Sequence, residues 1–253
     1  MILRTFRGLI QILGALGAGL AILLVVLAWR LSAGPVSLAF LSPYIERALE
    51  ASQQIIRIKL DDTILTWGGW ERSLDIHVVN VRAVRSGGAI IASVPELAFS
   101  ISGPALFRGV VAPSSIELFG PSLRLVRDRD GRVHFGFEKG TAESEELLKG
   151  ALAAFLAPPD RDHPSGYLTR FGVVKAQLTV EDRVLQRTWR APSAEVQLRR
   201  NAEGIGGSVS FELEAGGRLA LVNASGSYGV ASRHVDLDVK FSDVVPAEFA
   251  QIL

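Results

Sequence analysis

Downstream of Ile55, apolar and polar residues alternate in short runs, and this period of two is the strongest constraint on the fold. In the first run, Ile56 and Ile58 alternate with Arg57 and Lys59. Because successive side chains of a strand point to opposite faces, such runs predict strands with one apolar and one polar face. Most of the 25 glycines and 11 prolines interrupt these runs, as turns do in all-β chains. The sequence therefore predicts a mainly β fold with antiparallel strands.

Two interruptions of this alternation have their own signals. In the run at 73–84 the apolar residues change from even to odd positions, which predicts a β-bulge near Val78 and Val79. Between two later strand runs, the segment Gly103–Gly109 contains proline and no alternation, and it predicts one helical turn.

A hairpin is predicted where two alternating runs, 122–127 and 132–137, flank the turn sequence Asp128-Arg129-Asp130-Gly131. A three-residue loop pairs Leu125 with Phe135 and Leu123 with Phe137, which gives one apolar face. A two-residue loop would pair Leu125 with a glycine instead. The three-residue loop calls for a type I turn with Gly131 in the left-handed region.

Two segments have helical spacing instead. The segment Ser144–Ala157 predicts a helix of medium length, and its apolar face is formed by Leu147, Leu148, Ala151, Leu152 and Phe155. The segment 43–51, after Ser42, predicts a short amphipathic helix. This helix either covers one end of the sheet or lies on a bilayer surface; its acidic residues favour the first.

These helices are too few to cover the apolar faces of roughly a dozen strands of about six residues. Two arrangements solve the problem: the sheet packs on itself as a sandwich, or it curls into a groove. A large apolar face that stays open usually marks a binding site. Alternation alone does not separate the two arrangements.

The N-terminal part holds 22 residues without a charge, Gly8–Trp29. As a helix this run would reach about 33 Å, enough to cross a hydrocarbon core of about 30 Å. Arg4 and Arg7 precede it, so a cytoplasmic N-terminus is expected. A cleaved signal peptide is the alternative, but its apolar region would be shorter, about 7 to 15 residues. The predicted membrane-anchor residues are Leu9, Ile12, Leu16, Leu20, Leu23, Leu24, Leu27 and Trp29.

Composition argues against several functions. Without Arg4, Arg7 and Arg30, 24 of the 27 basic residues remain against 26 acidic ones, which is no electrostatic signature of nucleic-acid binding. The chain has no cysteine, which excludes disulfides and thiolate chemistry. No nucleophile elbow, phosphate loop or metal-ligand spacing of histidines occurs. We therefore expect no enzyme activity, no catalytic residue, no cofactor and no metal.

Four stretches together resemble the AsmA-like superfamily of bacterial envelope proteins, within it most closely the YhdP-like branch, with TamB as a relative. They are Phe40–Ile45, Leu65–Trp67, Val94–Leu97 and Ile116–Gly131, behind an N-terminal anchor. The resemblance implies a curved antiparallel groove of the β-taco type, anchored in the inner membrane, that carries phospholipids towards the outer membrane. It implies no catalytic residues. Family members are commonly several times longer, so spanning the periplasm is not assigned to this segment.

The resemblance leads to the expectation of a periplasmic, single-pass, lipid-binding conduit for phospholipid transport and envelope integrity. Its expected partners are the inner membrane, phospholipid acyl chains and other envelope proteins, and not nucleic acid. An anchored β-sandwich scaffold for envelope assembly, without lipid transfer, is the alternative. The residues expected to line the groove are Ile56, Ile58, Leu74, Ile76, Leu97, Phe99, Ile101, Leu123, Leu125, Phe135, Phe137, Val196, Leu198, Phe211, Leu213, Val235 and Leu237.

The expected organisation follows the chain in order, and the second β region is expected to continue beyond Leu253. The segments are a cytoplasmic tail (1–7), the anchor (8–29), a juxtamembrane segment with the short helix (30–54), a first β region (55–140), a helix and loop insertion (141–166) and a second β region (167–253).

Overall fold

The computed structural model describes residues 18–19, 22, 26, 36–37, 56–66, 75–85, 87–138, 140–215, 218–230 and 232–243. The predicted helix at 43–51, Leu74 and the eight predicted anchor residues lie outside this set. Among the described residues, none of the helices combines the length and the apolar character that crossing a membrane requires.

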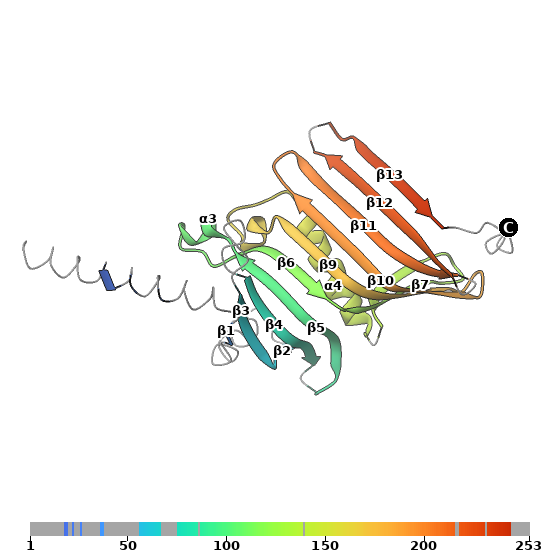
Figure 1. Cartoon of the computed structure of the whole chain (residues 1–253), viewed down its shortest axis with the longest axis horizontal. Helices are drawn as coiled ribbons and strands as arrows, with labels where there is room; N and C mark the ends of the chain where they lie inside the picture. The colour runs from blue at the N-terminus through green and yellow to red at the C-terminus, as the bar shows by residue number, and fades with distance from the viewer. Residues whose placement is uncertain are drawn as a thin grey trace, which may run out of the picture.

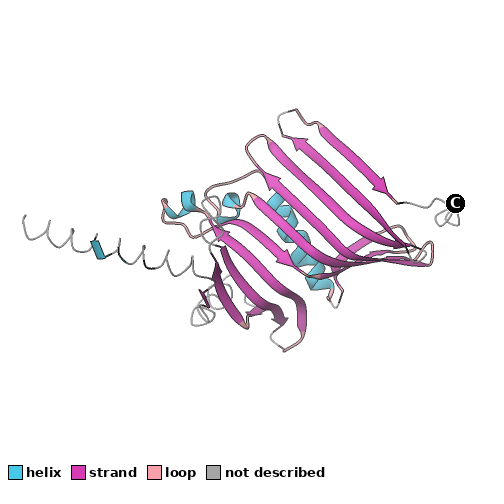
Figure 2. Cartoon of the chain, viewed as in Figure 1, coloured by secondary structure: helices cyan, strands magenta, loops and turns pink. Residues whose placement is uncertain are grey.

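The described chain is mainly β and forms one curved, open sheet (Figures 1 and 2). The two predicted β regions are therefore parts of one layer, and no second sheet packs on it within the described residues. The strands are β1 (Val36–Ser37), β2 (Ile56–Lys59), β3 (Asp62–Thr66), β4 (Asp75–Arg85), β5 (Ile90–Ile101), β6 (Pro113–Phe119), β7 (Ser122–Arg127), β8 (Val133–Phe137), β9 (Arg170–Asp182), β10 (Arg187–Arg200), β11 (Gly204–Ala215), β12 (Arg218–Gly229) and β13 (Val235–Ser242). The helices are α3 (Gly103–Leu106), α4 (Ala142–Leu156) and the 3-10 turn η2 (Pro164–Tyr167).

The strands follow the order β1-β3-β4-β5-β6-β9-β10-β11-β12-β13, with β2 beside β4 and the β7–β8 hairpin beside β9. Most neighbours are antiparallel, as predicted, but β9 runs parallel to both β6 and β7. The expectation of a purely antiparallel sheet is wrong at this point. The reason is the segment between β8 and β9: it contains α4 and returns the chain to the end of the sheet where β6 began, as parallel pairing requires.

The β7–β8 hairpin has the predicted register, with Leu125 opposite Phe135 and Leu123 opposite Phe137. The Gly131 N–H donates to the Asp128 carbonyl at 2.9 Å, and Gly131 has a φ of 82°. The three-residue loop and the left-handed glycine are confirmed. The helical turn predicted at 103–109 is also confirmed, as α3.

A row of backbone irregularities crosses the middle of the sheet. Asn80 lies opposite Pro95, because Val79 pairs with Glu96 and Val81 with Val94 on its two sides. The register of β5 with β6 continues this row to Gly120, where an added Cβ would lie 3.6 Å from Pro95 Cγ.

The row extends to Lys175, since β6 and β7 keep one common offset to β9 on either side of Gly120. Asn80, Gly120 and Lys175 all have left-handed backbones, with φ of 53°, 63° and 53°. In β10, the register with β9 shifts on both sides of Ala194, where the row would arrive. A left-handed residue reverses the side of the sheet on which the following side chains point. The row therefore crosses five neighbouring strand positions. Beyond each of them, the residues that point to a given face change from even to odd numbers or the reverse.

The bulge predicted near Val78 and Val79 is wrong in its position. The register between β4 and β5 is continuous there and shifts only between Ala83 and Val84. The change of parity that motivated the prediction is made instead by Asn80, within a continuous ladder.

The main core cluster lies along this row. Its buried members come from β5, β6, β7, β9 and β10: Val94, Leu118, Leu123, Val173, Ala176 and Ala194. In β5, Val94 precedes and Leu97 follows Pro95 at opposite parity, yet both belong to this cluster or pack against it. The irregular row thus keeps apolar side chains from both halves of each strand on one face.

Helix α4 contacts β8, β5 and η2, and in the figures it lies behind the middle strands. The side chain of Phe155 is 2% exposed, and its ring centroid lies 6.3 Å from that of Phe171. The predicted apolar face of this helix is only partly correct, because Ala151 and Leu152 are exposed. The first turn of α4 packs against Gly136 and its last turn against the sheet, so its middle lies away from the strands.

Arg200, the last residue of β10, joins the helix to the sheet. Its guanidinium donates from Nη1 to the carbonyls of Phe155 and Ala157, both at 2.9 Å, and more weakly to that of Ala154 at 3.3 Å. From Nη2 it donates to the carbonyls of Ser165 and Leu168, both at 2.7 Å. The side chain is 5% exposed, and its Cζ lies 5.2 Å from the centroid of the Phe155 ring.

Replacing this arginine, Arg200→Met, should lower the free energy of unfolding by about 3 kcal/mol or more, because several buried carbonyls lose a charged donor. The matched control is Arg199→Met, since Arg199 is exposed on the opposite face and its replacement should change stability by no more than about 0.5 kcal/mol. Chemical denaturation followed by circular dichroism measures both. Equal effects of the two substitutions would contradict the assigned role.

A second substitution tests the irregular row. Gly120→Ala should cost about 1–2 kcal/mol, because the left-handed backbone places a Cβ against the following carbonyl. Gly87→Ala is the control, as its backbone is not left-handed and nothing lies within 4 Å of the added Cβ. If Gly120→Ala is as stable as Gly87→Ala, the left-handed conformation at Gly120 is not required.

Candidate functional site: the apolar face of the sheet

One face of the sheet carries a continuous set of apolar side chains, as the strand registers show. From β4 to β10, Ile76 pairs with Phe99, Phe99 with Ile116, Ile116 with Phe171, and Phe171 with Leu198 in the neighbouring strand. Directly opposed residues of paired strands point to the same face. These five side chains therefore form one apolar row from β4 to β10.

A second row continues the same face to the last strand. Ala176 faces Ala194, Ala194 faces Phe211, Phe211 faces Val222 and Val222 faces Phe241. Ala176, Ala194 and Phe211 also belong to the main core cluster or pack against it. The apolar face thus extends without interruption from β4 to β13.

Burial decreases along this face towards β13. Leu123 in the middle is 8% exposed, whereas Leu237 on β13 is 72% exposed and Phe241 is 65% exposed. All eight residues of β13 are exposed on both faces, and its alternate residues include Asp236 and Asp238. The face is consequently a packed core in the middle and an open apolar surface at β13.

The structure places most of the predicted groove residues on this face, at very different depths. Buried is Leu123; partly buried are Ile58, Ile76, Leu97, Phe99, Ile101, Leu125, Phe137, Val196, Leu198, Phe211 and Leu213. Exposed are Phe135, Val235 and Leu237. The backbone of Ile56 lies in β2, and Leu74 lies outside the described residues.

The predicted set misses several members of the face, among them Val222, Val239 and Phe241. The alternation within β13 would have identified Val239 and Phe241, which share the parity of Leu237. Arg200 shares the parity of Leu198 and points to the same face. The sequence did not identify it, because a charged residue is expected on the polar face.

The opposite face is polar, and its groups are paired. Ser115 Oγ donates to Ser100 Oγ at 2.7 Å, and Ser100 Oγ in turn donates to Asp75 Oδ1. On the neighbouring positions His77 Nδ1 interacts with Glu96 Oε1, and the His77 ring stacks 6.1 Å from that of Phe119. All of these residues except Glu96 line a small cavity of about 120 Å³, which is too small for a lipid.

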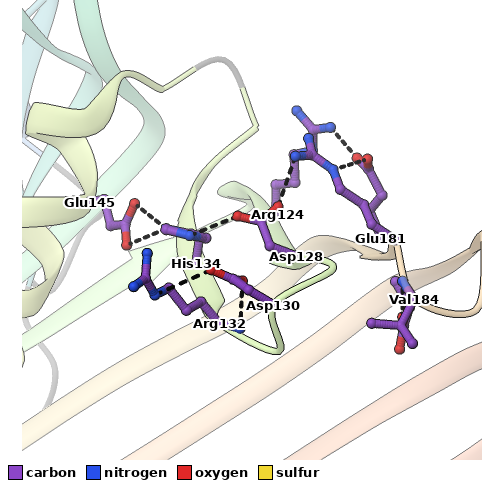
Figure 3. Close-up of polar contacts among 10 residues, drawn as sticks. Arg124, Asp128, Asp130, Arg132, His134, Glu145, Glu181 and Val184 are labelled. Carbon is purple, nitrogen blue, oxygen red and sulfur yellow. Dashed lines mark hydrogen bonds and ion pairs between the residues drawn. The ribbon is translucent and has the colours of Figure 1, made fainter.

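A charged network lies at the other end of the sheet, around the β7–β8 and β9–β10 turns (Figure 3). Glu181 accepts hydrogen bonds from Arg124 Nη2 and, at 3.0 Å, from Arg183 Nε. Arg183 Nη1 also donates to Asp128 Oδ1 at 2.8 Å, and Asp128 Oδ2 lies 3.1 Å from His134 Nε2. The network therefore connects β7, β8 and β9 through their ends.

On its other side, His134 Nδ1 lies 3.3 Å from Glu145 Oε1, which accepts at 2.7 Å from Lys149. Hydrogen bonds from Arg124 and Arg183 hold the pKa of Glu181 below its usual range, and hydrogen bonds from Lys149 and His134 do the same for Glu145. The adjacent cavity of about 810 Å³ is lined by acidic and basic side chains together. Ion pairs account for these shifts: those of Glu181 connect the turns, and the strongest partner of Glu145 is Lys149, one turn further along α4.

Among the described residues, no group of three or more histidines and acidic residues is arranged to hold a metal ion. Comparison with models of protein families, with curated proteins and with solved structures gives no match.

The charged network predicts a dependence of stability on acid. Because folding lowers the pKa of Glu181 below 4.5, its stabilising effect is complete well above that pH and is lost as the pH falls through the folded value. Glu181→Gln should therefore destabilise the chain at neutral pH and lose this effect well below pH 4.5. Glu212→Gln, on β11 and outside the network, is the control. Denaturant midpoints at neutral pH and well below pH 4.5 test this. A lower midpoint of Glu181→Gln that persists in acid would contradict it.

Proposed function

We propose that this chain is the N-terminal segment of an inner-membrane-anchored periplasmic conduit that binds phospholipid acyl chains. The observation that carries the proposal is the continuous apolar face of a single open sheet, which is packed in the middle and exposed at β13. Apolar surfaces of this extent on one side of a sheet are typical of binding sites. The 22-residue uncharged run and the AsmA-like resemblance supply the membrane attachment and the class of ligand.

The chemistry of the exposed end suits acyl chains. Val235, Leu237, Val239 and Phe241 offer aliphatic and aromatic carbon on one side of β13, and they are 42% to 72% exposed. Covering such side chains with a lipid tail gains about 0.8 kcal/mol per CH₂ group relative to water. The gain relative to a bilayer is close to zero, so the face would exchange lipid with a membrane without giving the transfer a direction.

A scaffold for envelope proteins is the second candidate, and one observation favours it. Within the described residues β13 pairs only with β12, so its outer edge presents unpaired backbone groups beside an exposed apolar row. Another protein could add a strand at such an edge and cover the same row. Both candidates therefore use the exposed surface of β13. The kind of molecule that contacts this surface distinguishes them.

The test places a photoreactive benzoyl-phenylalanine at Leu237 in the full chain in native membranes. The conduit predicts covalent adducts with the mass of phospholipid at this position, because acyl chains would cover it. The matched control is the same replacement at Asp238, the neighbouring residue on the opposite face of β13, where no lipid adduct is expected.

Protein adducts at Leu237 without lipid adducts would support the scaffold and overturn the conduit. Equal lipid labelling at Leu237 and Asp238 would also contradict the conduit, because it would show unspecific contact with the membrane.

A further inference from the structure

The loop that contains α3 presents large apolar side chains to solvent. Phe107 is 96% exposed, Val111 is 74% exposed and Leu106 is 51% exposed. A single exposed apolar residue needs no explanation, but three within six positions form a small apolar tip. We refer to Leu106, Phe107 and Val111 as the α3 tip.

The backbone of this loop is held by its own hydrogen bonds. Ser102 Oγ accepts from the Ala105 N–H at 3.3 Å and caps the turn, and the Phe107 N–H donates to the Gly103 carbonyl at 3.1 Å. The Val110 N–H then donates to the Ala105 carbonyl at 3.0 Å. The exposed side chains thus belong to a built turn of defined geometry.

The underside of the loop is packed against η2. Ala105 is 0% exposed and Ala112 is 1% exposed, and both form a small core cluster with Tyr167 of η2. Arg108 Nη1 donates to Tyr167 Oη at 3.3 Å. Since the small residues face the core, the large apolar ones of the α3 tip are left on the outside, where the loop cannot bury them.

The α3 tip lies at the same end of the molecule as the described residues 18–19, which belong to the uncharged run. In Figure 1 the blue helical piece at residues 18–19 lies at the same end of the long axis as α3. The opposite end carries the charged turns with Asp128, Arg129 and Arg183. From α3 to that end, the successive strands β6 and β7 span about 50 Å at about 3.3 Å per residue. The apolar and the charged surfaces are therefore at opposite ends.

We infer that the α3 tip inserts into the interfacial layer of the bilayer in which the proposed anchor is embedded. The inference rests on the membrane attachment in the proposed function and adds a second, peripheral contact to it. Aromatic and aliphatic side chains on a rigid turn are suited to the boundary between head groups and acyl chains.

The loop before η2 carries both signs of charge, with Asp160, Arg161, Asp162 and His163, and the one charged residue among positions 103–111 is Arg108. The contact is consequently apolar in origin. It should form on zwitterionic phosphatidylcholine and change little when anionic phosphatidylglycerol is added.

Because the chain contains no cysteine, one introduced cysteine can be labelled uniquely. The experiment uses the full chain in phosphatidylcholine vesicles, with Phe107→Cys carrying an environment-sensitive fluorophore. The control is Arg129→Cys with the same label, in an exposed turn at the charged end. The label at position 107 should show a blue-shifted emission and be quenched by spin-labelled lipids, and the label at position 129 should do neither.

Thermal unfolding of both labelled variants first checks that the fold is intact, as the exposure of both positions leads us to expect. If both variants float with the vesicles but the label at position 107 remains in water, the inference is wrong and the anchor stands. If neither variant floats with the vesicles, the membrane attachment of the proposed function and this inference are overturned together. The crosslinking at Leu237 tests the lipid face separately.

Discussion

A single sheet without a second layer can form a core only if its apolar side chains stay on one face. The fold therefore relies on the backbone irregularities that keep them there. The left-handed residues Asn80, Gly120 and Lys175 lie in one row across neighbouring strands. Without them, the strict alternation of each strand would send the apolar side chains beyond the row to the other face. With them, side chains such as Leu118 and Leu123 remain on the same side and join one core. The row is therefore what keeps the apolar face continuous.

Arg200 is the second feature on which the fold relies, because it joins α4 to the sheet. Three of its five acceptor carbonyls come from the last turn and C-cap of α4, where the helix dipole favours a positive charge. Burial lowers the pKa of this guanidinium, but an arginine stays charged in proteins, so the carbonyls must compensate the cost of its burial. The same side chain holds the loop at Ser165 and Leu168, which leads into β9. It thereby positions the whole segment that makes β9 parallel to β6.

Local patterns predicted the features that depend on local chemistry. The hairpin at Asp128–Gly131 followed from turn residues and parity, and Val235 and Leu237 of the β13 row followed from simple alternation. The parallel pairing of β9 was not predictable in this way, because it depends on where a 32-residue connection from Glu138 to Thr169 returns the chain. Lys175 and Arg200 were missed for a different reason. A charged residue in an alternating run normally marks the solvent side. Only the fold shows that Lys175 has a left-handed backbone and that Arg200 is a buried hydrogen-bond donor.

The depth of the predicted groove residues narrows the place where an acyl chain could lie. Around Leu123 and Val94 the space is filled by side chains, and inserting a lipid tail there would strain a packed core by about 1–3 kcal/mol or more. Along β13 no such repacking is needed, because Val235, Leu237 and Phe241 are exposed already. From Val235 to Phe241 this row extends about 20 Å at about 3.3 Å per residue. An acyl chain spans about half of a hydrocarbon core of about 30 Å, so one tail of about 15 Å would cover most of this row. We therefore place the proposed exchange of lipid at β12 and β13, because the middle of the sheet is already packed with side chains.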